Sequence, residues 1–149
     1  MARVLVAADT EWLHNEIRSV LGGPDTTVDS VYSGAEVRDR VGDDPPDLVV
    51  LDLQIGTMGG MATCLDLRLE EGAGRLEHVP VLMLLDRRPD VFLARRSKAE
   101  GWLLKPLDPI RLRRAAQALL GGGTYFDASY LPEPVAVPAT SGNLEGSGK

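Results

Sequence analysis

The chain has 149 residues, of which 44% are hydrophobic and 26% charged, which is the composition of one globular domain and not of a disordered chain. Its formal net charge of −6 disfavours direct nucleic-acid binding, which depends on neutralising phosphates, and its single cysteine excludes an intrachain disulfide. The first apolar run stops at Asp9, and no run approaches the roughly 20 apolar residues that span a bilayer, so we expect a cytoplasmic protein with no secretory signal and no membrane contact.

Short apolar segments alternate with longer segments of helical periodicity. The expected strands, in chain order, cover residues 3–8, 26–31, 47–52, 79–85 and 102–104. The expected helices cover residues 10–21, 33–41, a stretch after Gly60 that includes Met61 and Leu69, 90–98 and 108–120. Strands that are apolar throughout are typical of parallel strands buried on both faces. The alternation therefore predicts an α/β fold in which a parallel sheet carries helices on both faces.

The composition changes at the end of the last expected helix. From Gly121 onward, Gly, Pro, Ala and Ser dominate, and no strand or helix periodicity is present. We therefore expect one folded domain over residues 1–120 and a flexible Gly/Pro-rich tail over residues 121–149.

Four residues end or directly follow the expected strands one, three, four and five: Asp9, Asp52, Leu85 and Lys105. The carboxyl ends of parallel strands meet at one edge of the sheet, where such folds bind ligands. Asp9 and Asp52 supply two hard oxygen ligands for Mg²⁺, and Lys105 supplies a compact charge for a phosphoryl oxygen. Each residue alone is explained as a helix cap, a solvated strand end or an exposed lysine. Together they favour phosphoryl transfer, with Asp52 as the nucleophile that forms an acyl phosphate.

Four stretches of sequence surround these residues: RVLVAAD, DLVVLDLQIGTMGG, PVLMLLD and GWLLKPLDPIRL. With them, residues 2 to about 120 resemble the receiver domain of bacterial two-component response regulators. The resemblance implies a flavodoxin-like, five-stranded parallel sheet in the order 2-1-3-4-5. It implies Asp52 as the phosphoacceptor, Lys105 in contact with the phosphoryl group, and Mg²⁺ on Asp9, Asp52 and the backbone carbonyl of Gln54. The implied phosphoryl donor is a sensor histidine kinase or a phosphotransfer protein.

Four positions depart from the pattern of that family. Ala8 stands where the first of two consecutive acids is usual, and losing such an outer-shell group typically costs ~10–100-fold in metal affinity. Leu85 replaces a Thr or Ser whose hydroxyl closes onto the phosphoryl group, a hydrogen bond worth ~1.5–3 kcal/mol. Gly56 replaces a proline in the loop after Asp52. Trp102 takes the place of the Tyr or Phe that acts as a switch together with residue 85. The other interpretation is that Trp102 is a core residue at the edge of the strand.

These features predict a single-domain response regulator receiver that is not itself an enzyme and accepts a phosphoryl group on Asp52, with weakened Mg²⁺ binding and switching. Residues 86–114 hold nine of the sixteen Lys and Arg. Such clusters are usually solvated helix faces, but we expect the basic face of the fourth helix, fifth strand and last helix to bind a downstream protein or form a homodimer. The main alternative is a pseudo-receiver, an interaction module that works without phosphorylation. Ala8 and Leu85 favour it, whereas Asp52 and Lys105 oppose it.

Two other classes of protein fit the sequence less well. A phosphohydrolase of the haloacid dehalogenase type needs a second acid two residues after its nucleophile, and Gln54 cannot transfer a proton. Dinucleotide binding needs a Gly-x-Gly turn after the first strand, which residues 7–10 lack. His14 and His78 have no Cys or acid at ligand spacing, so we expect both of them on the surface.

Overall fold

The computed structural model describes residues 1–128, and the predicted tail from residue 129 to residue 149 lies outside the described residues. Within that part, the strands are β1 (Ala2–Ala7), β2 (Thr26–Val31), β3 (Leu48–Asp52), β4 (Val81–Leu85), β5 (Gly101–Leu104) and β6 (Tyr125–Phe126). The helices are α1 (Glu11–Leu21), α2 (Ala35–Asp43), α3 (Gly60–Gly72), α4 (Asp90–Arg96) and α5 (Pro109–Leu120). None of these helices has the length and hydropathy needed to cross a membrane.

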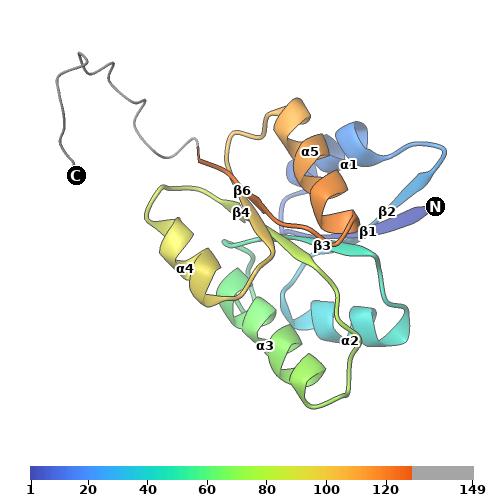
Figure 1. The fold of residues 1–149 in the computed structure, drawn as a ribbon, viewed down its shortest axis with the longest axis vertical. Helices are drawn as coiled ribbons and strands as arrows, with labels where there is room; N and C mark the ends of the chain where they lie inside the picture. The colour runs from blue at the N-terminus through green and yellow to red at the C-terminus, as the bar shows by residue number, and fades with distance from the viewer. Residues whose placement is uncertain (129–149) are drawn as a thin grey trace, which may run out of the picture.

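All strands of the sheet run parallel, in the order β2-β1-β3-β4-β5-β6. Helices α1 and α5 cover one face, and α2, α3 and α4 cover the other (Figure 1). The predicted α/β class and the strand order 2-1-3-4-5 are confirmed. The predicted number of five strands is wrong for the described chain, because β6 continues the sheet beyond β5.

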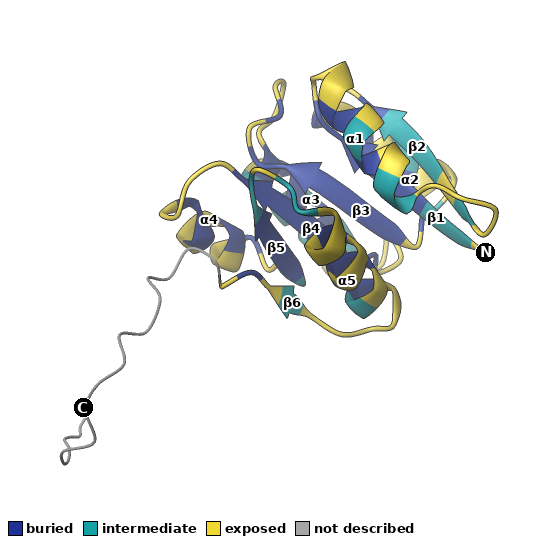
Figure 2. Ribbon diagram, turned by 90° about the horizontal axis from the view of Figure 1, so that it is seen from above, coloured by how far each residue is buried: buried dark blue, intermediate teal, exposed yellow. Residues whose placement is uncertain are grey.

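The core consists of two apolar layers, one on each side of the sheet. Side chains alternate along β1: Leu5 packs with the α2, α3 and α4 side, whereas Val4 and Val6 pack with the α1 and α5 side. Every residue of β3 and of β4 is buried, as Figure 2 shows by their dark blue colour between helices with exposed outer faces. This burial explains why the central strands are apolar almost throughout.

The segment over residues 121–128 is part of the fold, whereas we expected the folded domain to end at residue 120. It turns at Gly122, which has a φ of +87°, and then pairs with β5 as β6, so that Tyr125 lies opposite Gly101. A Cβ atom on Gly101 would lie 2.6 Å from the Tyr125 carbonyl oxygen, so the strands approach this closely only because residue 101 is glycine. The buried Asp127 carboxylate accepts a hydrogen bond from the Leu104 backbone at 3.0 Å. Without this segment the backbone groups at the outer edge of β5 would have no strand partner.

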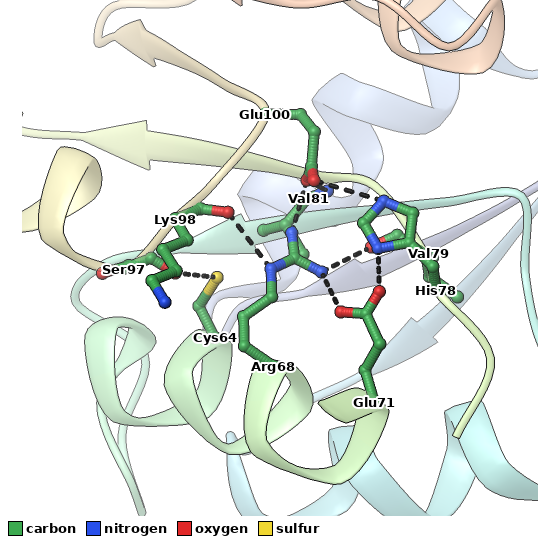
Figure 3. A network of polar contacts seen from close by, with 9 residues as sticks. All are labelled: Cys64, Arg68, Glu71, His78, Val79, Val81, Ser97, Lys98 and Glu100. Carbon is green, nitrogen blue, oxygen red and sulfur yellow. Dashed lines mark hydrogen bonds and ion pairs between the residues drawn. The ribbon is translucent and has the colours of Figure 1, made fainter. Parts of the chain in front are cut away.

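A polar network joins α3 to the amino-terminal ends of β4 and β5 (Figure 3). The Arg68 guanidinium donates to the backbone carbonyls of Lys98 and Val79, both at 3.1 Å, and pairs with Glu100. Glu100 also accepts from the Val81 backbone N–H at 2.8 Å. His78, 53% exposed as expected from the sequence, lies between Glu71 and Glu100. The network fixes the sheet at the end opposite to Asp52.

Candidate functional site

Parallel pairing brings four of the predicted site residues to one edge of the sheet. Asp52 is the last residue of β3, and it lies opposite Leu84 of β4. Leu85 ends β4 and lies opposite Leu104, so Lys105 follows directly at the end of β5. Asp9 lies in the loop that follows β1, whose last residues pair with β3. The sheet therefore places all four loops at its carboxyl-terminal edge.

Asp52 is held at the rim of the sheet with most of its surface covered. The residue is 4% exposed, and its Oδ1 atom accepts a hydrogen bond from Lys105 Nζ at 2.9 Å. The same oxygen accepts from the backbone N–H of Gln54 at 3.2 Å. These two donors, one of them a cation, orient the carboxylate that would act as the nucleophile.

Lys105 binds a second carboxylate in addition to Asp52. Its backbone N–H donates to the Leu85 carbonyl at 2.8 Å, and its peptide bond to Pro106 is cis. Its Nζ atom lies 2.8 Å from Asp86 Oδ1. Burial by itself lowers the pKa of the Lys105 ammonium, but hydrogen bonds to Asp86 and Asp52 outweigh burial and raise that pKa. Lys105 is therefore a permanent cation at this site.

Sequence reasoning missed Asp86. It is the last residue of the stretch PVLMLLD, but a single polar residue after a strand is an ordinary turn residue, and no role was assigned to it. Its position one residue after the fourth strand, at the edge that Lys105 shares, was the available signal.

Asp9 is oriented by the loop between β3 and α3. Its Oδ2 atom accepts a hydrogen bond from the Gly56 backbone N–H at 3.2 Å. A proline at position 56 has no N–H and could not donate this bond. The glycine at position 56, where the family usually has proline, therefore allows a backbone hydrogen bond to Asp9.

The loop that carries Gly56 is bound to the start of α2. The Gly56 carbonyl accepts from the Gly34 backbone and the Thr57 carbonyl from the Ala35 backbone, both at 3.1 Å. Thr57 and Met58 have φ values of 51° and 72°, a backbone conformation that costs energy for residues other than glycine. The loop keeps this conformation because the two hydrogen bonds to α2 hold it in place.

Ala8, which replaces the missing acid, is completely buried in the apolar layer beneath α1 and α5. Its carbonyl oxygen accepts a hydrogen bond from His14 Nε2 at 2.7 Å, and the His14 ring packs 4.3 Å from that of Tyr32. The expectation that His14 lies on the surface is wrong, since it has no exposed area. The burial of His14 was not predicted, because it depends on a hydrogen bond from the ring to a backbone carbonyl, which the sequence pattern does not reveal. His14 thus supports the backbone next to Asp9.

The oxygen atoms at this edge suit a hard divalent cation. Among residues 1–128, no group of three or more His, Cys, Asp and Glu side chains is placed to hold a metal ion. The donors present are the Asp9 and Asp52 carboxylates and the backbone carbonyl of the exposed Gln54. Each carboxylate uses one oxygen for the hydrogen bonds described above. Two carboxylates and one carbonyl, completed by waters, match the ligand preference of Mg²⁺.

The two proposed switch positions are both buried. Leu85 has no exposed area and offers no hydroxyl to the site. Trp102 is 4% exposed, its ring stacks on Phe126 of β6 at 4.4 Å, and the Arg95 guanidinium lies 5.6 Å from its centre. In the described part of the chain its buried Nε1 atom has no hydrogen-bond partner. Trp102 is thus enclosed between α4 and β6, a contact that the sequence did not reveal.

Comparison with known proteins gives one consistent result. Residues 4–117 match the family model described as response regulator receiver domain. The chain is 32% identical over 120 residues to the DNA-binding response regulator MtrA of Mycolicibacterium paratuberculosis, covering 79% of this chain and 51% of MtrA. It is 28% identical over 133 residues to the nitrate/nitrite response regulator protein NarL of Escherichia coli, covering 88% of this chain and 60% of NarL. The chain therefore spans about half the length of the curated relatives it matches.

Solved structures share the fold. The chemotaxis response regulator CheY4 of Vibrio cholerae superposes with a TM-score of 0.71 at 22% identity, covering 80% of this chain and 98% of CheY4. A putative response regulator from Chloroflexus aurantiacus gives a TM-score of 0.73 at 22% identity, with the same coverage of 80% and 98%. At this level of identity the likeness shows the fold alone.

Proposed function

Because the chain belongs to the response regulator receiver family, we propose that its Asp52 accepts a phosphoryl group from a phosphohistidine of a sensor histidine kinase or phosphotransfer protein. The observation that carries the proposal is the position of Asp52 at the end of β3 with Lys105 Nζ 2.9 Å away. A carboxylate nucleophile next to a fixed cation is the minimum that phosphoryl transfer to an aspartate requires.

In the proposed step, an oxygen of the Asp52 carboxylate attacks the phosphorus of the donor. A phosphorus–oxygen bond forms, the phosphorus–nitrogen bond of the phosphohistidine breaks, and the imidazole nitrogen keeps the electron pair and takes up a proton. Lys105 neutralises charge on the transferred phosphoryl oxygens. The chain is here a substrate of its donor and a signalling module, not an enzyme that acts on other molecules.

Mg²⁺ is the proposed cofactor, held by Asp9, Asp52 and the Gln54 carbonyl. When bound, it neutralises charge on the phosphoryl oxygens. Gly56 orients the Asp9 carboxylate for this role. We propose weak binding, because the buried Ala8 offers no second acid to orient the metal's waters.

The partner face that we propose is the basic surface of α4, β5 and α5. In the structure this face also includes β6, which covers the outer edge of β5 and carries Phe126 with 51% of its surface exposed. Phe92 on α4 is 65% exposed. A downstream protein, or a second copy of the chain, would contact aromatic rings among basic residues here, and a direct role in nucleic-acid binding is not part of the proposal.

Intact-protein mass spectrometry tests the proposal. The chain is incubated with Mg²⁺ and acetyl phosphate or a kinase, and we expect a gain of one phosphoryl group that Asp52→Asn abolishes. The absence of a gain, or a gain that survives in Asp52→Asn, would refute phosphorylation at this residue.

The alternative is a pseudo-receiver, favoured by the two buried apolar residues Ala8 and Leu85. Fluorescence of Trp102 separates the two functions, provided that the exposed Trp12 is first replaced by Phe. A pseudo-receiver would show no Mg²⁺-dependent change in Trp102 emission and no thermal stabilisation by beryllofluoride, which imitates a phosphoryl group on a carboxylate. A receiver that accepts a phosphoryl group would show both the change in Trp102 emission and the thermal stabilisation.

A further inference from the structure

The Lys105 ammonium forms ion pairs with two carboxylates, Asp52 and Asp86, and Asp86 has no part in the chemistry proposed above. Lys105 Nζ lies 2.9 Å from Asp52 Oδ1 and 2.8 Å from Asp86 Oδ1. The sheet creates this arrangement, because the Lys105 backbone N–H donates to the carbonyl of Leu85 at 2.8 Å and so places residues 86 and 105 next to each other. Asp86 is therefore held within a few ångströms of the phosphoacceptor by backbone geometry.

The second ion pair of Lys105 matters because few other groups at this site could neutralise or hydrogen-bond the phosphoryl oxygens. Among residues 1–128, Lys105 is the one side-chain cation that pairs with Asp52. Leu85 has no hydroxyl, so β4 contributes no hydrogen-bond donor from that position. Neutralisation of a phosphoryl group on this side of the site therefore rests on Lys105, and Asp86 both attracts that ammonium and adds a negative charge nearby.

We propose that Asp86 is a positioning residue that competes with the phosphoryl group for the Lys105 ammonium and thereby lowers the affinity of the site for a phosphoryl group. The inference rests on the proposed function, since it concerns the same phosphoryl site. The bridging carboxylate is 39% exposed and Lys105 24% exposed, so solvent screens the pair only in part. One unit charge a few ångströms away in a partly solvated site changes an equilibrium constant by roughly fivefold or more.

Two other roles for Asp86 predict different results. If the ion pair with Lys105 is an ordinary surface salt bridge, its removal leaves the phosphoryl site unchanged. If Asp86 instead holds Lys105 in the correct place for the phosphoryl group, its removal weakens binding. The sign of the effect therefore distinguishes the three roles.

Beryllofluoride binding in the presence of saturating Mg²⁺ is the test, performed on the full chain and on Asp86→Asn. Asp39→Asn is the matched control, because Asp39 is an exposed residue of α2 and its replacement removes the same charge away from Lys105. We expect Asp86→Asn to bind beryllofluoride about fivefold or more tightly, Asp39→Asn to match the wild type, and Asp86→Glu to restore wild-type affinity. The gain should shrink as ionic strength rises, which a change in folding stability alone would not produce.

Mass spectrometry after acetyl phosphate treatment distinguishes failure of the role proposed for Asp86 from failure of the proposed function. If wild type and Asp86→Asn both gain a phosphoryl group but bind beryllofluoride equally, or if Asp86→Asn binds it more weakly, the role of Asp86 is refuted and the proposed function stands. If neither protein gains a phosphoryl group or binds beryllofluoride, both proposals are refuted.

Discussion

Replacement of Asp127 by Ala tests whether the segment after α5 belongs to the folded domain. Asp127 is 4% exposed, and its Oδ2 atom accepts from the Leu104 backbone N–H at 3.0 Å. Its own backbone N–H donates to the Trp102 carbonyl at 3.1 Å, a bond that the substitution keeps. The Ala variant therefore removes the acceptor of the Leu104 N–H, together with a 4.0 Å ion pair to the half-exposed Arg111, and leaves the backbone pairing of the strands intact.

The expected loss follows from the chemistry of that acceptor. A hydrogen bond to a charged group contributes ~1.5–3 kcal/mol, and a buried N–H left without a partner costs ~1–3 kcal/mol. We expect Asp127→Ala to lower the free energy of unfolding by about 2 kcal/mol, which corresponds to a fall in Tm of roughly 8 °C for a domain of this size. Asp127→Asn keeps an acceptor oxygen without the charge, so its loss should be about half as large.

Urea unfolding followed by far-UV circular dichroism measures the free energy, and hydrogen exchange measures protection of the Leu104 amide. Asp39→Ala on the exposed side of α2 is the control, for which a change within about 0.5 kcal/mol is expected. Unchanged stability together with unchanged protection of the Leu104 amide in Asp127→Ala would refute the docking of this segment on β5.

Three further predictions concern the site and the core. Gly56→Pro removes the N–H that donates to Asp9, so Mg²⁺ affinity in a titration should fall ~10-fold, and an unchanged affinity would show that Gly56 does not orient this acid. Leu85→Thr offers a hydroxyl at the end of β4 and should tighten beryllofluoride binding ~10-fold or more, whereas Leu85→Val, which is equally branched, should not. Burial raises the pKa of the Cys64 thiol from 9.0 to about 11, so the folded state keeps a proton that the unfolded state loses between these values. Stability should therefore fall as pH rises from 9 to 11, more steeply in the wild type than in Cys64→Ala, and equal slopes would contradict this account.

The sequence pattern was sufficient to predict the parallel α/β sheet and the position of Asp52 and Lys105, whereas the strand order was implied by the resemblance to receiver domains. The predictions of the sheet and of these two residues depend on local patterns, since apolar segments locate the strands and parallel strands bring their carboxyl ends to one edge. The contact between Lys105 and Asp86 depends on side-chain positions across two strands, which no periodicity encodes. The pairing of residues 125 and 126 with β5 escaped for a different reason, because two residues are too few to show alternation.

The departures from the family pattern have different physical consequences in the structure. Ala8 and Leu85 are read correctly from the sequence as missing polar groups, and both are completely buried. Gly56 looked like the loss of a rigid proline, but its effect is the gain of an N–H donor to Asp9. Whether a substitution adds or removes a contact depends on the backbone direction at that residue, which only the fold reveals.

The network around Arg68 makes the two ends of β4 and β5 differ in how firmly side chains hold them. At the amino-terminal ends of β4 and β5, Arg68 is bound by two backbone carbonyls and by Glu100, which in turn binds the backbone of β4 (Figure 3). At the opposite end, a single lysine serves two acids, and any added charge changes how it is divided. The strands are thus anchored by side-chain contacts at one end, whereas the loops that carry Asp86 and Lys105 lie at the other. Helices α4 and α5 begin directly after the loops that carry Asp86 and Lys105, at Asp90 and Pro109, so both lie next to the end of the sheet that this network leaves unbound.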